Sequence, residues 1–266
     1  MRRLRQELER ALLDDLPVLI EGESGTGKEV IGRFLHHHSR RGERPFLKLN
    51  CSALPARLME NEIYGYAKDR KTDSGDLKSV PIGLGSGGTL FFDEIGEMDL
   101  MLQRKLTATV ERGHYRLGDS GEERPIDVRF VCASTRVAKT GLASHQLLKG
   151  LLKPSAHYHL QLPPLRERKE DIPQLSEYLL AKFAREFKKP APRLNSALLQ
   201  AFQQWKWPGN IRELENWMAR IVIFGAEEVL ELGLNPQILA LKRPPRGNCH
   251  ESNMRFRRFR GMNRLR

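Results

Sequence analysis

The sequence predicts an α/β fold, with a five-stranded parallel sheet in a first domain and a small all-α domain after it. Up to about residue 160, short apolar runs alternate with helical patterns, which is typical of a parallel sheet covered by helices. After Pro163-Pro164-Leu165 only amphipathic helical patterns follow. We therefore expect an α/β domain at residues 1–168, a helical domain at 169–238 and a basic tail at 239–266.

Each strand is expected where a short apolar run is bounded by turn residues, and each helix where apolar residues recur at helical spacing. The predicted strands are Val18–Glu21, Phe46–Leu49, Thr89–Asp93, Val128–Ala133 and a last one near Leu160–Leu162. The predicted helices run from Lys28 to about His38, from Ile172 to about Phe187, from Ser196 to Gln204, and from Asn210 to about Phe224.

A phosphate-binding pattern, G-x-x-x-x-G-K, lies between the first predicted strand and helix. Its glycines allow a tight turn whose N–H groups point at one anion, and its lysine supplies a charge for the outer phosphates. Glu29 takes the place of the Ser or Thr that usually follows this lysine and holds magnesium, so another group must hold the metal. A glycine-rich turn with a surface lysine is the alternative, which the flanking strand and helix disfavour. The candidate nucleotide-binding residues are Gly22, Glu23, Ser24, Gly25, Thr26, Gly27, Lys28 and Glu29.

Two acidic residues, Asp93 and Glu94, end the third predicted strand. Parallel strands deliver such residues to the ligand-binding edge of the sheet. Asp93 is a candidate ligand of Mg²⁺, directly or through water. Glu94 is the candidate that orients and activates water for attack on a γ-phosphate.

The composition restricts the class of protein. The longest apolar runs fall well short of the about 18 residues of a membrane span, so we expect a soluble cytoplasmic protein with no membrane contact. Three cysteines without paired spacing indicate neither a disulfide framework nor a thiolate zinc site. The net charge is +12, and after residue 241 nine basic residues stand against one acidic residue. The basic tail is either a DNA-binding or RNA-binding arm or a solvated extension.

The sequence resembles the AAA+ domain of bacterial sigma-54-dependent transcription activators, also called enhancer-binding proteins, over residues 13–235. The matching segments are GESGTGKE at 22–29, LNCSALP at 49–55, GGTLFFDEIGEM at 87–98, DVRFVCAST at 127–135, LPPLRERKEDI at 162–172 and WPGNIRELEN at 207–216. The resemblance implies an AAA+ P-loop NTPase core with a small all-α lid.

The family resemblance implies roles for particular residues. Lys28 matches the phosphate-loop lysine, and Asp93 and Glu94 match the acidic pair. Asn50 matches the asparagine that pairs with the catalytic glutamate as a nucleotide-dependent switch, and Arg212 matches the lid arginine that senses the γ-phosphate of its own subunit. The implied cofactors are ATP and Mg²⁺. The implied partners are the sigma-54 RNA polymerase holoenzyme and further copies of the chain in a hexamer-type ring.

The chain departs from this family at the loop that contacts the sigma factor. Where the family reads GAFTGA, this sequence has a charged stretch of which only Thr72 matches. Lys68 and Thr72 are the candidate contacts of this altered tip.

A second departure concerns the arginines by which one subunit reaches the γ-phosphate of its neighbour. Leu148 and Pro154 occupy those positions. A smaller change places Ser134-Thr135 where the family usually has Thr-Asn, which removes an amide near the water. Two functions are thus open: an ATP-driven activator of sigma-54 polymerase, or a nucleotide-binding regulatory module with weak or no hydrolysis and no sigma-54 engagement. A truncated, inactive copy is a third reading.

Overall fold

The predicted α/β fold is confirmed by the structure. The computed structural model describes residues 2–64, 87–116, 123–135 and 157–226. Its main sheet has five strands, all parallel, in the order β2-β3-β6-β1-β7. These strands are β1 (Val18–Glu21), β2 (Phe46–Asn50), β3 (Thr89–Asp93), β6 (Arg129–Ser134) and β7 (Tyr158–Gln161). All five match predicted strands, with small shifts at their ends.

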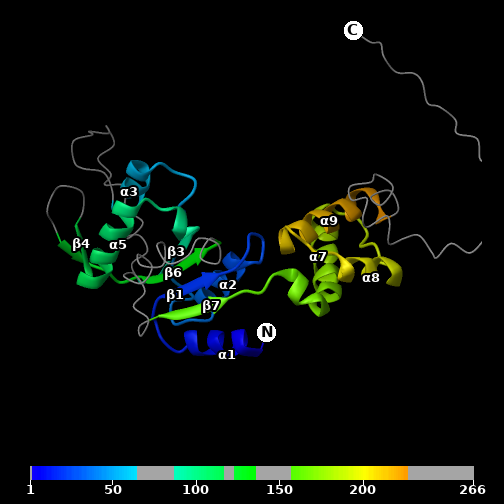
Figure 1. The fold of residues 1–266 in the computed structure, drawn as a ribbon, viewed down its shortest axis with the longest axis horizontal. Helices are drawn as coiled ribbons and strands as arrows, with labels where there is room; N and C mark the ends of the chain where they lie inside the picture. Colours follow the sequence, from blue (N-terminus) through cyan, green and yellow to red (C-terminus); the bar gives the residue numbers. More distant parts are fainter. Residues whose placement is uncertain (1, 65–86, 117–122, 136–156, 227–266) are drawn as a thin grey trace, which may run out of the picture.

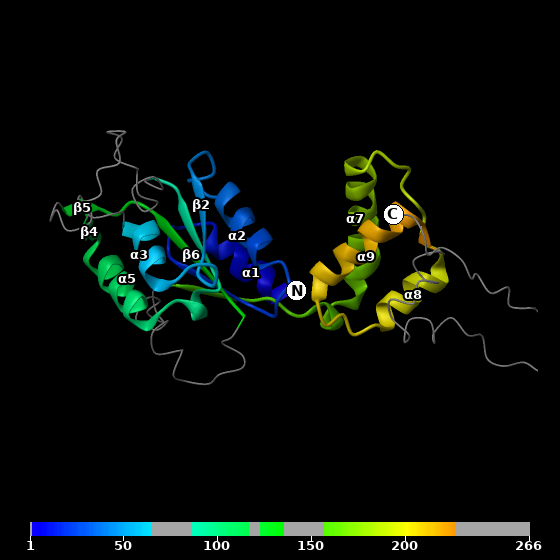
Figure 2. The same ribbon diagram turned by 90° about the horizontal axis from the view of Figure 1, so that it is seen from above.

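Helices cover both faces of the sheet (Figure 1, Figure 2). Helices α1 (Arg2–Ala11) and α2 (Lys28–His37) lie on one face, where they pack with Val18, Ile20 and Val131. Helices α3 (Ala56–Tyr64) and α5 (Leu100–Arg112) pack on the other face with Leu19, Phe92 and Cys132. Side chains alternate between faces along a strand, so an apolar strand supplies both clusters.

Several described elements were not among the specific sequence predictions. They are α1, α3, α5 and a short antiparallel hairpin of β4 (His114–Arg116) and β5 (Glu123–Pro125), with the 3₁₀ turn η1 (Ile95–Glu97). The hairpin is hard to predict, because its strands are short, and β5 is exposed throughout. No helix in the described part of the chain is long and apolar enough to cross a bilayer.

Three helices form the second, helical part of the chain within the described residues 157–226, as the sequence predicted. They are α7 (Ile172–Glu186), α8 (Ser196–Gln204) and α9 (Asn210–Phe224), preceded by the turns η2 (Leu165–Glu167) and η3 (Lys169–Asp171). Their apolar faces meet in one cluster that includes Leu179, Phe202 and Trp217. Trp207 is completely buried in this cluster and donates its indole N–H to the carbonyl of Phe202 at 2.7 Å. This packing places the first turn of α9 beside the loop between β1 and α2.

The sheet order also sets the position of the candidate site. β3 lies between β2 and β6, and Asn50 is in register with Asp93. Ser134, at the end of β6, is in register with Glu21 at the end of β1. Since all these strands are parallel, their carboxyl ends meet at one edge, where ligands bind in open α/β sheets.

Candidate functional site at the phosphate loop

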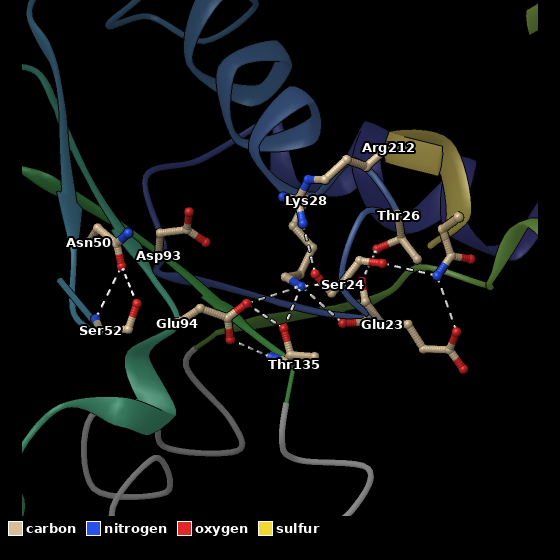
Figure 3. Close-up of polar contacts among 12 residues, drawn as sticks. Glu23, Ser24, Thr26, Lys28, Asn50, Ser52, Asp93, Glu94, Thr135 and Arg212 are labelled. Carbon is tan, nitrogen blue, oxygen red and sulfur yellow. Dashed lines mark hydrogen bonds and ion pairs between the residues drawn. The ribbon is translucent and has the colours of Figure 1, made fainter. Parts of the chain in front are cut away.

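The loop from Gly22 to Lys28 turns tightly between β1 and α2 (Figure 3). Gly25 and Gly27 have φ of 78° and 96°, a left-handed conformation that glycine adopts without strain. The buried Thr26 donates its hydroxyl to the carbonyl of Glu23 at 2.8 Å. The loop therefore leads into the N-terminus of α2, where the first N–H groups of a helix have no partner within the helix, as an anion site requires.

Lys28 is held inside this loop with only 7% of its side chain exposed. Its ammonium donates to the carbonyls of Gly22 at 3.0 Å and Glu23 at 3.3 Å, and to the hydroxyl of Thr135 at 2.8 Å. It also lies 3.5 Å from a carboxylate oxygen of Glu94. Burial lowers the pKa of Lys28, while the charge of Glu94 acts in the opposite direction. The positive charge of Lys28 therefore lies inside the phosphate loop, between the loop carbonyls and the carboxylate of Glu94.

Glu94 is anchored at the sheet edge by Thr135, which directly follows β6. One carboxylate oxygen accepts the backbone N–H of Thr135 at 3.0 Å, and the other accepts its hydroxyl. Glu94 itself has φ of 53°, an unusual conformation for a residue with a side chain. Such strain clusters at functional sites. Lys28, Thr135 and Glu94 thus form one connected polar group (Figure 3).

Asp93 forms an ion pair with Lys48 of β2, at 3.1 Å between the ammonium and carboxylate. The same ammonium lies 2.7 Å from Glu29 at the start of α2. Burial alone would lower the pKa of Lys48, but hydrogen bonds to Glu29 and Asp93 raise it above its ordinary value. Carboxylate oxygens that already attract a cation suit Mg²⁺, which usually binds one or two carboxylates together with substrate phosphates. The residues present therefore fit the implied metal.

The structure does not bring Asn50 to Glu94. The side-chain oxygen of Asn50 accepts hydrogen bonds from the backbone and hydroxyl of Ser52, at 3.1 and 2.9 Å. Glu94 bonds to Thr135 instead, so the expected pair is not formed between these two described residues (Figure 3). The physical reason is local: a side-chain oxygen that bonds two residues ahead closes a short turn at low entropic cost.

Helix α9 brings the predicted lid arginine to the loop. Arg212 donates from its guanidinium to the hydroxyl of Ser24 at 2.9 Å. The carbonyl of Gly25 accepts the backbone N–H groups of Ile211 and Arg212, at 2.9 and 3.3 Å. The first turn of α9 is therefore hydrogen-bonded directly to the phosphate loop, and the position of the lid depends on the conformation of that loop.

Asn210 strengthens this junction from a completely buried position. Its amide donates to Glu23 at 3.1 Å and to the carbonyl of Ser24 at 3.0 Å, while its oxygen accepts the N–H of Leu165 at 2.8 Å. Asn210 has φ of 53°, which asparagine tolerates better than most residues. One side chain thus links the phosphate loop, the turn η2 and the helix α9.

Two arginines of the segment before α7 also contact the phosphate loop. The guanidinium of Arg166 donates hydrogen bonds to both carboxylate oxygens of Glu23, at 2.7 and 2.8 Å. This is the bidentate geometry favoured between arginine and carboxylate. Arg168 is buried and donates to the carbonyl of Thr26 at 3.0 Å. Together with Asn210 and the first turn of α9, these arginines contact the loop at four consecutive residues, 23–26.

An open pocket of about 680 Å³ adjoins the loop. This volume lies in the range of ligand sites of about 300–1,000 Å³. Its walls come from α1, from the phosphate loop, from the ends of β6 and β7, and from the connection to the lid. Residues at its wall include Ser24, Thr135, Gln161, Pro164 and Arg166.

The sequence did not single out four of the residues that complete the site. The sequence pattern predicts only the loss of an amide at Thr135, and it predicts no role for Lys48, Arg166 or Asn210. The sequence does carry a signal for Thr135, because this residue directly follows a predicted strand, and the carboxyl ends of parallel strands bind ligands. In the structure this strand, β6, lies between β1 and β3. Lys68, Thr72, Leu148 and Pro154, and the predicted tail, lie outside the described residues.

Two known protein families match successive parts of the chain. Residues 1–161 match the family described as "Sigma-54 interaction domain", and residues 166–248 match the "AAA+ ATPase lid domain". The chain belongs to the sigma-54 activator family. The AAA+ core and helical lid expected from the sequence are confirmed by these two matches.

Similar proteins in this activator family are bacterial regulators. The chain is 35% identical over 246 residues to "Regulatory protein LuxO" of Vibrio parahaemolyticus, which covers 92% of this chain and 54% of LuxO. It is 39% identical over 236 residues to the "DNA-binding transcriptional activator HyfR" of Escherichia coli, covering 88% of this chain and 35% of HyfR. The chain thus spans about half or less of the length of these relatives.

The fold is also similar to solved structures. A crystal structure of NtrX from Brucella abortus in complex with ATP superposes with a TM-score of 0.74 at 25% identity, covering 92% of this chain and 56% of NtrX. The complex of NtrX with ADP gives a TM-score of 0.71 at 27% identity, covering 84% of this chain and 48% of NtrX. Both matches cover most of the chain.

Proposed function

We propose that this chain binds ATP with Mg²⁺ between the phosphate loop and the lid, and hydrolyses it to activate the sigma-54 RNA polymerase holoenzyme. The observation that carries this proposal is the connected group of Lys28, Thr135 and Glu94, next to an arginine supplied by the lid. Family membership and the ATP-bound structure of the similar NtrX support it.

Each residue of the group has a distinct task in this proposal. The N–H groups of the loop and the ammonium of Lys28 bind the outer phosphates. Glu94 lies beside Lys28 and orients a water for attack on the γ-phosphate, accepting its proton. Asp93 is the protein ligand of Mg²⁺, which supplies neutralisation of phosphate charge when bound.

Arg212 couples nucleotide to the lid. Its guanidinium bonds to Ser24 of the loop, within the segment that would surround the phosphates. An arginine forks two hydrogen bonds to phosphate oxygens, so a γ-phosphate would draw it away from Ser24. Because α9 is bonded to the carbonyl of Gly25, this exchange would change the lid position.

The proposed working form is a ring of several copies, as the family match supports. In the sequence, Leu148 and Pro154 occupy the positions at which family members carry the arginines that reach a neighbour's nucleotide. Leucine and proline carry no charge, so ATP turnover should be slower than in family members that have these arginines. An arginine finger of this kind contributes a factor of about 10³–10⁵ to the rate. The altered tip with Lys68 and Thr72 is the proposed contact with the sigma factor.

Phosphate release by the purified chain at high protein concentration tests the proposal. Wild type should release phosphate with ATP and Mg²⁺. Lys28→Ala should bind ATP much more weakly and should not turn it over, and Glu94→Gln should bind ATP without turnover. Release equal to that of Lys28→Ala would refute hydrolysis. If ATP still bound, the regulatory module without turnover would be the function instead.

The partner is tested separately with sigma-54 polymerase on a promoter with a sigma-54 site. Open complexes should form with ATP and not with a non-hydrolysable analogue. Equal yields with both nucleotides, or with neither, would refute ATP-driven activation.

A further inference from the structure

Lys48 is the third residue of the edge strand β2, and it connects two acidic residues from different elements. Its ammonium lies 2.7 Å from Glu29, at the start of α2, and 3.1 Å from Asp93, at the end of β3. The three side chains are only partly exposed, at 34% for Lys48, 36% for Glu29 and 22% for Asp93. A charge pair in this setting is less screened than one on the open surface.

The position of this ammonium matters because of the proposed function, on which the inference rests. Asp93 is the proposed protein ligand of Mg²⁺, and one of its oxygens already accepts the ammonium of Lys48. Two cations that use the same carboxylate weaken each other's binding. The position after the phosphate-loop lysine holds Glu29, which binds Lys48 and so keeps its ammonium near Asp93.

We propose that Lys48 is a positioning residue that sets the Mg²⁺ requirement of the nucleotide site. It holds Asp93 and Glu29 in place by a shared ion pair, and it competes with Mg²⁺ for Asp93. Metal binding then includes the release of Asp93 from Lys48, and the concentration of Mg²⁺ needed for half-maximal nucleotide binding is higher than it would be without the ammonium.

Arg33 provides a matched comparison. It donates to the other oxygen of Glu29 at 2.8 and 2.9 Å, from one turn further along α2. Replacing either cation by methionine removes one positive charge paired with Glu29. Both cations form an ion pair with Glu29, and Lys48 also forms one with Asp93. The two variants therefore separate a general change in charge from competition at the metal ligand.

The experiment measures binding of ATP with a fluorescent label on its ribose, by anisotropy, while Mg²⁺ is titrated. In Lys48→Met, the half-maximal Mg²⁺ concentration should fall about tenfold. An opposite charge within about 4–6 Å lowers the proton affinity of a carboxyl group by about tenfold or more, and we expect a similar effect on its affinity for Mg²⁺. The affinity at saturating Mg²⁺ should stay within about threefold. Arg33→Met and the charge-conserving Lys48→Arg should stay close to wild type.

The outcomes distinguish the inference from the proposed function. An unchanged half-maximal Mg²⁺ concentration in Lys48→Met, with normal ATP binding, would overturn the role of Lys48 and leave nucleotide binding intact. An equal shift in Arg33→Met would also overturn it, since charge alone would then explain the effect. Weaker binding at every Mg²⁺ concentration would show that Lys48 only supports the fold. No ATP binding by wild type would overturn both proposals.

Discussion

Replacing Thr135 by valine should slow ATP hydrolysis more than it weakens ATP binding. The substitution keeps the shape of the side chain and removes the hydroxyl that bonds to Lys28 and Glu94. A hydrogen bond to a charged group contributes about 1.5–3 kcal/mol. If that amount is lost from the transition state, kcat falls about 10- to 150-fold, at 1.36 kcal/mol per factor of ten.

ATP affinity should change much less in this variant. Lys28 retains its two carbonyl contacts in the loop, and Glu94 retains the backbone N–H of Thr135. We expect a change of KM below about threefold, measured by steady-state phosphate release.

Ser134→Ala is the matched control, because the Ser134 hydroxyl is buried and lacks a hydrogen-bond partner in the part of the chain that the structure describes. Its turnover should stay within about twofold of wild type. A kcat for Thr135→Val within twofold of wild type would refute the reasoning, as would an equal loss in the control.

Three further predictions follow from the contacts of the loop. Gly25→Ala places a methyl group on a residue with a left-handed backbone, and this methyl group would meet the carbonyl of Gly209 in the lid. The free energy of unfolding, measured in urea, should therefore fall by at least about 1 kcal/mol. Unchanged stability would contradict the lid contact. Arg212→Met should reduce the preference for ATP over ADP about tenfold in competition binding, whereas Arg220→Met, on the exposed side of α9, should not. A hydrogen bond from Lys48 holds the pKa of Glu29 below its ordinary value of 4.5, so Glu29 stabilises the fold above that pH and less as the pH falls. The difference in Tm between wild type and Glu29→Gln should therefore shrink below pH 4.5, and a constant difference would argue against this ion pair.

The sequence predicted the sheet well because its strands are short apolar runs that are buried on both faces. Leu90, Phe91 and Phe92 of β3 illustrate this, since all three are completely buried. The phosphate loop was equally readable, because its glycines and lysine are close together in the chain and their spacing follows from one local geometry.

The remaining site residues depend on contacts between distant parts of the chain. Arg166 meets Glu23 from 143 positions away, and Thr135 meets Lys28 from 107 positions away. Lys48 alternates with apolar neighbours on an edge strand, a pattern typical of a solvated side chain. Only the order of the strands brings it to Asp93. Asn50 bonds to nearby Ser52 in this structure, and its pairing with Glu94 stays a prediction.

Calorimetric titration of ATP into the chain with Mg²⁺ present tests the central claim most directly, because it measures occupation of the site without requiring turnover or a partner. The structure predicts one ATP per chain for wild type, and a loss of affinity of about 30-fold or more in Lys28→Ala, which removes the charge at the centre of the loop. Equal heats and affinities for the two proteins, or no binding by wild type, would contradict the assignment of this loop as a nucleotide site.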